Sequence, residues 1–466
     1  MSVLSKIKEW FHVTVNRKVT EEFQIDAVGS DQMKNWVQEC INIYQGSPCW
    51  LDEDDEIDTV NFAKAICSET ARLATLGIGI KVDGSARARW LQEQIDKVYY
   101  QLRHWAEYGC AHGTIILKPN GTTIDLYTPG QFEITHAVDG LIDGIVFYDS
   151  KKVGEKWYTR LEYHRYVGKQ YHITNKCYVG NHEGDTKKRV DIKQSPWDYL
   201  QEEAAIVNVS TPLFAVFRTP QANNIDLDSP YGLPIFSEAI QELRDLDIAY
   251  SRNSSEITDS KRTVMVDDSL VMQAGKKVST TGAQNAAKRI GLPKMAKMVR
   301  GDGRETYYQE INPQLNTTSR LEGINALLSQ IGYKVGYSNG YFVFNESSGI
   351  QTATGVEAEQ QRTVQFIKDV RDKLESCITN LIYALNVFAD LYGYAPSGAY
   401  EVAFDFGDIT YNRDEDRTRW WGYVTQGKVP AWRFFVKFEG MTEDDAKAMV
   451  AEAQPAMPTL FSGGGE

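Results

Sequence analysis

Apolar residues recur at helical spacing from residue 31 to about residue 110. Steps of three or four residues place them on one face of each predicted helix. Glycine and proline interrupt the first pattern at Gly46-Ser-Pro48, and the third leads to Gly109. The residues that define the three predicted helices are Met33, Trp36, Cys40 and Tyr44; then Phe62, Ile66, Ala71 and Leu73; then Leu91, Ile95, Val98 and Leu102.

From about residue 113 to residue 218 the period changes to two, which predicts strands. Two apolar runs, 115–117 and 124–127, flank Asn120-Gly121, a dipeptide that favours a tight hairpin. A second hairpin is predicted from 157–166 to 171–174, with its turn at Gly168-Lys169. This region is therefore expected to form an antiparallel sheet.

Three further helices are predicted in the second half of the chain. The first follows the turn Ser229-Pro-Tyr-Gly232, and the other two begin at capping boxes, Ser319-Arg-Leu-Glu322 and Thr354-Gly-Val-Glu357. The third would run for about 38 residues, roughly 57 Å. Its wide apolar face favours packing against a core over a coiled coil. The three stripes are Ala239, Leu243, Leu246, Tyr250 and Ile257; Leu321, Ile324, Leu328, Ile331 and Val335; and Ile367, Val370, Leu374, Ile378, Leu381, Leu385, Phe388 and Tyr392.

A basic insertion separates the first two of these helices. Residues 261–304 contain ten Lys or Arg and three Asp, so their net charge is 10 − 3 = +7 in a chain of −13. The insertion also contains Gly275, Gly282 and Gly301-Asp-Gly303, which favour loops. We expect an element that contacts partners; a solvated insertion is the alternative. The basic residues are Lys261, Arg262, Lys276, Lys277, Lys288, Arg289, Lys294, Lys297, Arg300 and Arg304.

Composition and charge narrow the classes of protein. The 466 residues suffice for roughly two to four domains of about 150 residues. Hydrophobic residues make up 42% and charged residues 24%, as in ordinary globular proteins. Affinity for DNA comes mainly from Lys and Arg on phosphates, and 50 basic against 63 acidic residues argue against a protein that simply grips DNA.

Cysteine spacing and hydropathy argue against three further features: a zinc ribbon, a disulfide framework and a membrane span. The six cysteines are scattered without a C-x-x-C pair, which argues against a zinc ribbon or a disulfide framework and favours reduced thiols. No run of 18 apolar residues predicts a membrane span. Residues 1–11 are expected to form a short amphipathic helix, and the acidic stretch 52–58 a solvated loop.

Motifs for catalysis are missing. The sequence has no P-loop, no H-E-x-x-H and no G-x-S-x-G, and His104 and His112 are too far apart in sequence for an i, i+4 metal pair. We therefore expect no enzyme, no catalytic residues, no metal and no cofactor. A metal-dependent nuclease built on dispersed Asp and Glu is the less favoured alternative, because such ligands need no local motif.

Six short segments stand in order along the chain between about residue 31 and residue 452. They are Trp36 to Gly46, Tyr158-Thr-Arg-Leu-Glu-Tyr-His164, Ser229-Pro-Tyr-Gly-Leu-Pro-Ile-Phe236 with Leu246-Asp247 and Glu256, Thr352-Ala-Thr-Gly-Val356, Val402-Ala-Phe-Asp-Phe-Gly-Asp408 and Gly440-Met-Thr-Glu-Asp-Asp-Ala446. Together they resemble portal (head–tail connector) proteins of long-tailed bacteriophages of Gram-positive bacteria. In one of them Gly355 stands where the family usually has Glu.

The resemblance implies an α+β portal fold with a wing, a helical stem, a clip and a crown. The wing would comprise residues 1–234 and 336–408, including a tunnel loop at 343–353 and a long helix at 354–392. The stem helices would be 235–259 and 313–335, and the clip 260–312. Residues 409–466 would form the crown and a disordered tail.

The resemblance also implies site residues. The DNA-facing tunnel loop would present Asn345, Glu346, Ser347, Ser348, Gly349, Ile350 and Gln351. The clip would dock partners through Lys276, Lys277, Lys288, Arg289, Lys294 and Lys297. Candidates to line the tunnel along the stem are Glu238, Glu242, Asp245 and Glu256.

The function implied is that of a ring of about twelve subunits at the capsid portal vertex of the virion. DNA would be packaged and ejected through it, and the ring would be assembled in the host bacterial cytoplasm. Its expected partners are double-stranded DNA, the terminase large subunit, a head–tail adaptor, and the major capsid and scaffold proteins, with no membrane. Another phage head–tail ring or tail-vertex protein is the structural alternative.

Overall fold

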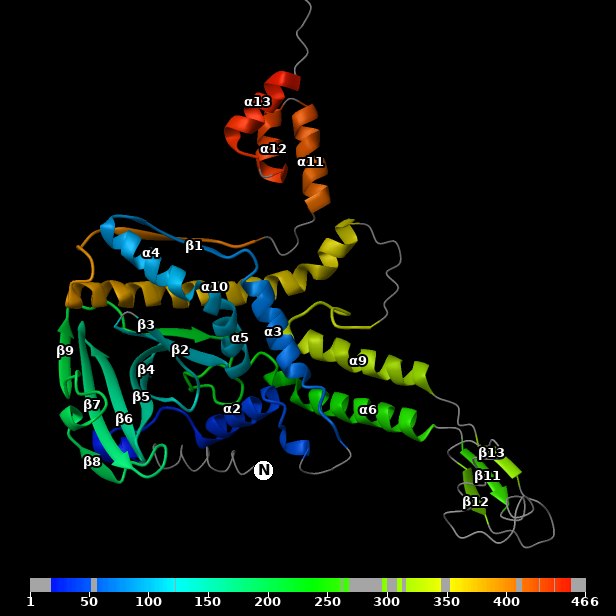
Figure 1. Cartoon of the computed structure of the whole chain (residues 1–466), viewed down its shortest axis with the longest axis horizontal. Helices are drawn as coiled ribbons and strands as arrows, with labels where there is room; N and C mark the ends of the chain where they lie inside the picture. Colours follow the sequence, from blue (N-terminus) through cyan, green and yellow to red (C-terminus); the bar gives the residue numbers. More distant parts are fainter. Residues whose placement is uncertain are drawn as a thin grey trace, which may run out of the picture. The chain divides into compact units, whose positions relative to one another are not determined.

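The computed structural model describes residues 18–51, 57–121, 123–260, 263–267, 296–299, 308–311, 316–344, 353–407, 413–426, 428–439 and 441–453. The chain forms two compact units, Met1–Asp405 and Phe406–Glu466 (Figure 1). The predicted N-terminal helix, acidic positions 52–56, tunnel-loop positions 345–351, most of the clip and the tail lie outside the described residues.

The N-terminal helices follow the predicted pattern in part. Helices α2 (Asp31–Tyr44) and α3 (Phe62–Ala74) confirm the first two predictions. The side chain of Ser30 caps α2 by accepting a hydrogen bond from the Met33 amide. The third predicted helix is instead divided into α4 (Ala86–Val98), a 3-10 turn (Tyr99–Gln101) and α5 (Leu102–His112).

Strand β1 was not predicted. It spans Gly79–Gly84, between α3 and α4, and pairs antiparallel with β14 (Tyr400–Asp405), with Val82 opposite Val402. The two strands are more than 300 residues apart in the sequence. The pair therefore joins the N-terminal helices to the end of the first unit.

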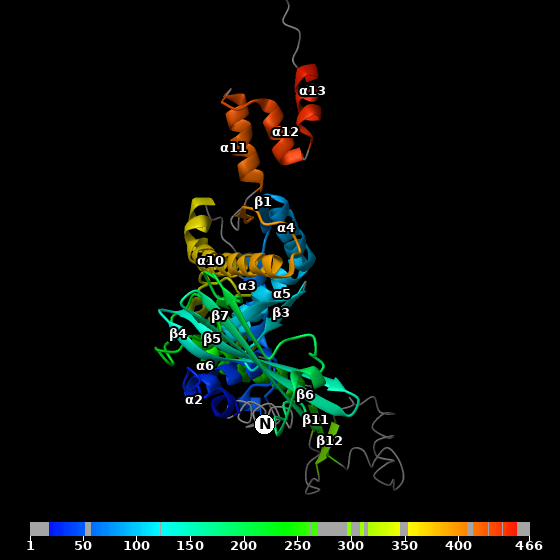
Figure 2. The same cartoon turned by 90° about the vertical axis from the view of Figure 1, so that its left-hand side faces the viewer.

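Two antiparallel sheets confirm the predicted strand region and both hairpins. One has the order β10-β2-β3, and the other the order β4-β5-β6-β7-β8, with β9 also pairing with β7. Figure 2 shows β5, β6 and β7 running side by side as long twisted strands. The strands are β2 (Thr114–Asn120), β3 (Thr123–Tyr127), β4 (Phe132–Val138), β5 (Leu141–Val153), β6 (Lys156–Val167), β7 (Gln170–Gly180), β8 (Lys188–Val190), β9 (Glu203–Val207) and β10 (Ala215–Arg218).

Helix α10 (Ala353–Tyr392) is the predicted core-facing helix. It packs on β10 and β2 and contacts α3 and α4. Ile367, Val370 and Leu374 are buried, as are most later positions of the predicted stripe. The main core also includes residues of α2 and of both sheets. The chain is thus an α+β protein whose longest helix is covered on several sides.

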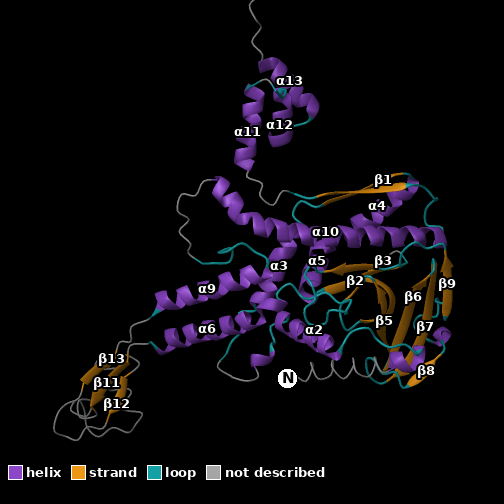
Figure 3. Cartoon of the chain, turned by 180° about the vertical axis from the view of Figure 1, so that it is seen from behind, coloured by secondary structure: helices purple, strands orange, loops and turns teal. Residues whose placement is uncertain are grey.

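Helices α6 (Ile240–Asp259) and α9 (Thr317–Val335) run side by side (Figure 3). A 3-10 turn (Ser237–Ala239) precedes α6, so the helix starts later than the predicted residue 235. Both predicted capping boxes are wrong. Asn316 is the N-cap of α9, and α10 includes Ala353, so Ser319 and Thr354 lie within the helices.

The insertion between α6 and α9 contains strands as well as loops. Strand β11 (Thr263–Asp267) pairs parallel with β12 (Ala296–Val299) and antiparallel with β13 (Tyr308–Ile311). The flanking positions 268–295 and 300–307 are outside the described residues. The loop-rich prediction therefore missed a small sheet.

The second unit contains helices α11 (Arg413–Thr425), α12 (Ala431–Glu439) and α13 (Glu443–Ala453). Phe434, Phe438 and Ala446 are buried, and Trp421 packs edge-on against Phe434. The unit begins at Phe406, three residues before the expected crown boundary at 409. None of the described helices is long and apolar enough to cross a membrane.

Candidate functional site

Helices α6 and α9 are joined by ion pairs at two levels. The Lys334 ammonium lies 2.6 Å from Glu242, near the start of α6 and the end of α9. Arg320 pairs with Glu256 at the other end of both helices. Glu256 also accepts a hydrogen bond from the Asn316 amide at 3.1 Å. The two helices are therefore antiparallel and form a single helical hairpin around the insertion.

The four acidic residues predicted to line a tunnel differ in their surroundings. Glu242 and Glu256 are bound to α9 as above, so their charges are largely balanced within the chain. Glu238 is exposed, and only its carbonyl oxygen binds Lys334. Asp245 accepts a hydrogen bond from Gln241. Among the described residues, Glu238 and Asp245 have no ion-pair partner, in contrast to Glu242 and Glu256.

Hydrogen bonds hold the segment that contains Trp50, Asp58 and Val60 along the side of α6 that faces away from α9. Buried Asp247 accepts hydrogen bonds from the Trp50 indole at 3.0 Å and from the Val60 amide at 2.9 Å. The Ser251 hydroxyl accepts a hydrogen bond from the Asp58 amide at 2.8 Å. Burial raises the pKa of the Asp247 carboxyl, and the hydrogen bonds oppose that shift only in part.

The other predicted site residues are only partly described. Lys297 lies on β12, whereas Lys276, Lys277, Lys288, Arg289 and Lys294 lie outside the described residues, as do all the named tunnel-loop positions. The segment just before residues 345–351 is held against α3. Buried Tyr337 shares a 2.7 Å hydrogen bond with Thr70, and Tyr341 donates one to Glu69 at 2.6 Å.

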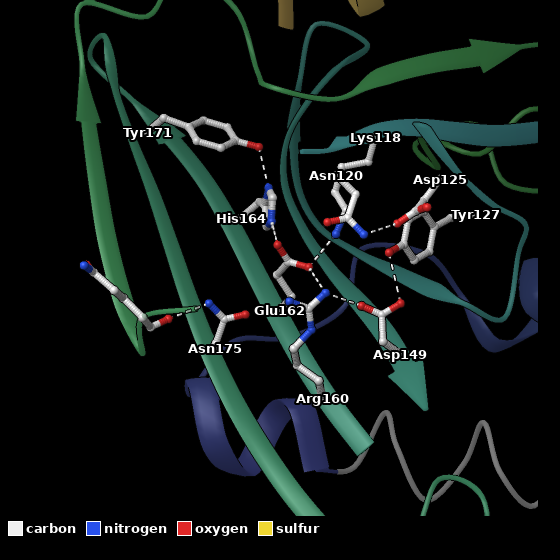
Figure 4. A network of polar contacts seen from close by, with 11 residues as sticks. Lys118, Asn120, Asp125, Tyr127, Asp149, Arg160, Glu162, His164, Tyr171 and Asn175 are labelled. Atoms are coloured by element: carbon white, nitrogen blue, oxygen red, sulfur yellow. Dashed lines mark hydrogen bonds and ion pairs between the residues drawn. The ribbon is translucent and has the colours of Figure 1, made fainter. Parts of the chain in front are cut away.

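A buried charged network in the first unit was missed by the sequence analysis (Figure 4). Glu162 on β6 pairs with Lys118 on β2 and, at 2.8 Å, with Arg160 on its own strand. Its other oxygen lies 2.8 Å from Nε2 of His164, whose Nδ1 lies 2.6 Å from the Tyr171 hydroxyl. Arg160, Glu162 and His164 occupy every second position of β6, so they lie on the same face of the strand. This spacing of two residues was the signal in the sequence by which they could have been grouped.

Burial and neighbouring charges shift the pKa of two members of the network, Glu162 and His164. Burial alone would raise the pKa of Glu162, but Lys118, Arg160 and His164 bring it well below its usual range. Burial lowers the pKa of His164, although Glu162 opposes the shift. A carboxylate can only accept, so the neutral imidazole donates from Nε2 to Glu162 and accepts at Nδ1 from Tyr171.

Perturbed carboxylate–histidine pairs also occur in catalytic sites, so access matters. A surface groove of about 450 Å³ is lined by residues of β3, α5 and β5. Of the residues labelled in Figure 4, Asp125, Tyr127 and Asp149 line the groove, and Tyr127 donates a 3.0 Å hydrogen bond to Asp149. Glu162 and His164 are buried away from the groove. The network therefore connects the two sheets, and Glu162 and His164 do not line the groove.

The described residues contain no cluster of His, Cys, Asp or Glu arranged to hold a metal ion. The six cysteines are free thiols, and Cys49 is the exposed one. Among known proteins, no family model matches the chain and no curated protein is significantly similar to it.

Proposed function

We propose that the chain is the subunit of a portal ring at the capsid vertex of a tailed bacteriophage, through which DNA is packaged and ejected. The observation that carries this proposal is the α6–α9 hairpin. Its two helices are covered by the rest of the chain at one end, while Tyr250, Ile257 and Leu321 are exposed at the other. Isolated helices are marginal in water, so such an end needs neighbours.

The order of the elements supports the same proposal. A helix-and-sheet region precedes the hairpin, a strand-containing basic insertion interrupts it, a long helix follows, and a separate helical unit ends the described chain. These correspond to the wing, stem, clip, wing and crown that the resemblance implies. The wing, stem, clip and crown assignments belong to this proposal.

Charge fits a channel that guides DNA without holding it. A ring of twelve copies would carry 12 × −13 = −156. Duplex DNA carries about one negative charge per 1.7 Å of its axis, so an acidic bore repels the backbone and lets it slide. Glu238, which is exposed, and Asp245, which is half-buried, are the described stem residues that would contribute.

The proposal assigns the chemistry of packaging to other proteins. The terminase large subunit would supply ATP hydrolysis and dock at the clip, which later would bind the head–tail adaptor. The major capsid and scaffold proteins would be further partners of the ring. The chain itself would be no enzyme and would need no cofactor.

Two measurements on the purified full chain test the proposal. Negative-stain images should show rings with a central hole, and native mass spectrometry should give about twelve copies. Monomers or dimers at every concentration would contradict it. Incubation with duplex DNA and Mg²⁺ should leave the DNA intact, and cleavage that copurifies with the chain would favour a nuclease instead.

A further inference from the structure

The sequence contains two Asn-Gly dipeptides, Asn120-Gly121 and Asn339-Gly340. In such a dipeptide the amide nitrogen of the glycine can attack the side-chain carbonyl carbon of the asparagine, because glycine has no Cβ to hinder the approach. The attack forms a cyclic imide and releases ammonia. Water then opens the imide to aspartate or to isoaspartate, in which the main chain runs through the side chain. Each dipeptide is therefore a candidate site of spontaneous covalent modification.

Solvent access and backbone conformation do not distinguish the two dipeptides. Asn120 and Asn339 are both exposed. The glycines that follow them both have positive φ, 64° for Gly121 and 78° for Gly340. The difference between the two sites lies in the groups that surround each asparagine side chain.

Asn120 is held at the end of the β2–β3 hairpin. Its side-chain nitrogen donates a 2.8 Å hydrogen bond to the Asp125 carboxylate, and its main-chain oxygen accepts one from the Thr123 hydroxyl at 2.9 Å. Asn120 also lies opposite Thr123 in the strand pairing, which fixes its backbone. Attack on the Asn120 side chain would place negative charge on its oxygen, and the neighbouring Asp125 carboxylate opposes that charge.

Asn339 has the opposite environment. The Ser329 hydroxyl of α9 donates a hydrogen bond to the side-chain oxygen of Asn339. A donor at this oxygen stabilises the negative charge that develops there when the glycine nitrogen attacks. Within the described residues, the Gly340 amide donates no backbone hydrogen bond, so the attack breaks no such bond.

The segment around Asn339 is anchored to other helices on both sides of this residue. The Ser338 amide donates to the Thr363 hydroxyl on α10 at 2.8 Å, and the Tyr341 hydroxyl donates to Glu69 on α3 at 2.6 Å. Isoaspartate adds one methylene group to the main chain at position 339. Because the segment is held at both ends, an added main-chain atom between the anchors has to displace one of them.

We infer that Asn339 converts spontaneously to isoaspartate and aspartate with assistance from Ser329, and that isoaspartate there releases the segment from α3. The Gly340 nitrogen forms a bond to Cγ of Asn339, the Cγ–Nδ2 bond breaks, and ammonia leaves with the proton of the Gly340 amide. Water then adds to the imide, so no oxidant or reductant takes part. The reaction goes beyond the portal function proposed above and does not depend on it.

Peptide mass spectrometry of the purified full chain tests the difference between the sites. Mildly alkaline incubation favours the reaction, because the glycine amide attacks after it loses its proton. Asn339 should convert from amide to acid at least about tenfold faster than Asn120, since one donor to a developing oxyanion is worth that much or more. An L-isoaspartyl methyltransferase should label the peptide that contains residue 339 and leave the β2–β3 peptide unlabelled. Equal rates, or faster conversion of Asn120, would overturn the inference.

The same incubation in urea separates the effect of the fold from that of the sequence. Unfolding removes Asp125 from Asn120 and Ser329 from Asn339, so the two dipeptides should then react at nearly equal rates. A preference for Asn339 that is as large in urea as in the folded protein would assign it to neighbours in the sequence and contradict the role of Ser329.

The variant Ser329→Ala isolates the contribution of the hydroxyl. Alanine is the better helix former, so α9 should remain folded. Conversion at Asn339 should slow by about tenfold, less than for a donor in a buried active site, because the oxygen is exposed to water. Asn120 in the same sample is the internal control, and Ser329→Thr, which keeps a hydroxyl, is the matched variant. An unchanged or faster rate in Ser329→Ala would exclude assistance by this group.

Hydrogen exchange tests the effect on the anchors. Asn339→Asp keeps the main-chain length and an acceptor for Ser329, so amides of residues 337–344 should exchange as in the original chain. Incubated protein enriched in isoaspartate should exchange there at least about tenfold faster, because the segment then opens locally. Equal exchange in the incubated protein and in Asn339→Asp would overturn the release from α3.

Discussion

At the residue scale, the buried network shows what charge balance requires. Lys118 and Arg160 bring two positive charges into the first unit, and Glu162 and Asp149 bring two negative charges. Burying an ion is costly unless it is paired, so each member depends on the others. Strand alternation places Arg160 and Glu162 on the same face of β6. It could not predict their partner, since Lys118 comes from a different sheet.

Removing one charge of the network should therefore lower the free energy of unfolding more than removing two paired charges together. Lys118→Met should lower the free energy of unfolding by about 3–5 kcal/mol, because Glu162 loses a buried partner. Urea denaturation measures the change. The double variant with Glu162→Gln should regain at least half of the loss. A single-variant effect below about 1 kcal/mol would show that water already compensates Glu162.

His164 should make stability depend on pH. Its folded-state pKa is lowered, chiefly by burial, below the unfolded value of about 6.5. The folded state therefore prefers the neutral ring, and its contribution is complete above about pH 6.5 and lost as the pH falls further. His164→Gln should flatten the decline in unfolding free energy below pH 6.5 by up to about 1.4 kcal/mol per pH unit.

Urea titrations at pH 7.5, 6.5 and 5.5 check this slope. His182→Gln, which replaces an exposed histidine, is the control and should keep the slope of the original chain. Glu162 adds a second loss at lower pH, because its folded-state pKa lies well below its usual range. An unchanged slope in His164→Gln would mean that His164 does not titrate in this window.

At the element scale, periodicity predicted most elements and few of their boundaries. Helix α10 was predicted because its apolar stripe persists over many turns. Its start was misplaced because Thr354 and Glu357 fit a capping box, although the helix already includes Ala353. Local patterns carry no information on β1, which depends on β14 more than 300 residues later.

The same limit applies to the candidate site. The predicted helix 235–259 contained all four acidic candidates, so the sequence made them equal candidates to line a tunnel: Glu238, Glu242, Asp245 and Glu256. Which of them is neutralised depends on α9, reached only after the insertion. Likewise the exposure of Tyr250 and Ile257 depends on where the covering chain stops. The sequence pattern identifies the apolar face of a helix, whereas tertiary packing determines how much of that face is buried.

Arg371 joins helices α3 and α10, and its substitution should be among the most destabilising in α10. Its buried guanidinium donates to the carbonyls of Leu73 at 2.9 Å and Ala74 at 3.1 Å, at the end of α3. Arg371→Met leaves these carbonyls without that donor and should reduce the unfolding free energy by about 2–3 kcal/mol. Thermal and urea unfolding measure the loss. Lys373→Met, at an exposed position of the same helix, should change it by less than about 0.5 kcal/mol.

At the scale of the whole molecule, charge is distributed unevenly. Residues 261–304 carry +7, so the remaining chain carries −13 − 7 = −20. Exposed charges act over about 8–10 Å at physiological salt, so partners near the insertion meet a positive field although the molecule is acidic. If the insertion is the clip, acidic surfaces of the motor or adaptor are the groups that it would attract.

Reversing Lys276, Lys277, Lys288 and Arg289 to Glu tests this role. Four reversals change the net charge by 4 × −2 = −8, from −13 to −21 per chain. Rings should still form, because the hairpin and the core of the first unit are unchanged, but binding of terminase or adaptor should weaken. Raising the salt should shrink the difference, since screening removes the field that was reversed.

A matched control makes the same change of net charge at a different place in the chain. Lys151, Lys152, Lys187 and Lys188 are exposed on the sheet β4–β8 and its connections, and their reversal to Glu also adds −8. Partner binding measured by sedimentation should be lost in the insertion variant and kept in this control. Equal loss in both would mean that net charge, and not the insertion, governs docking. Loss of rings in the insertion variant alone would instead place these four residues in the contact between copies.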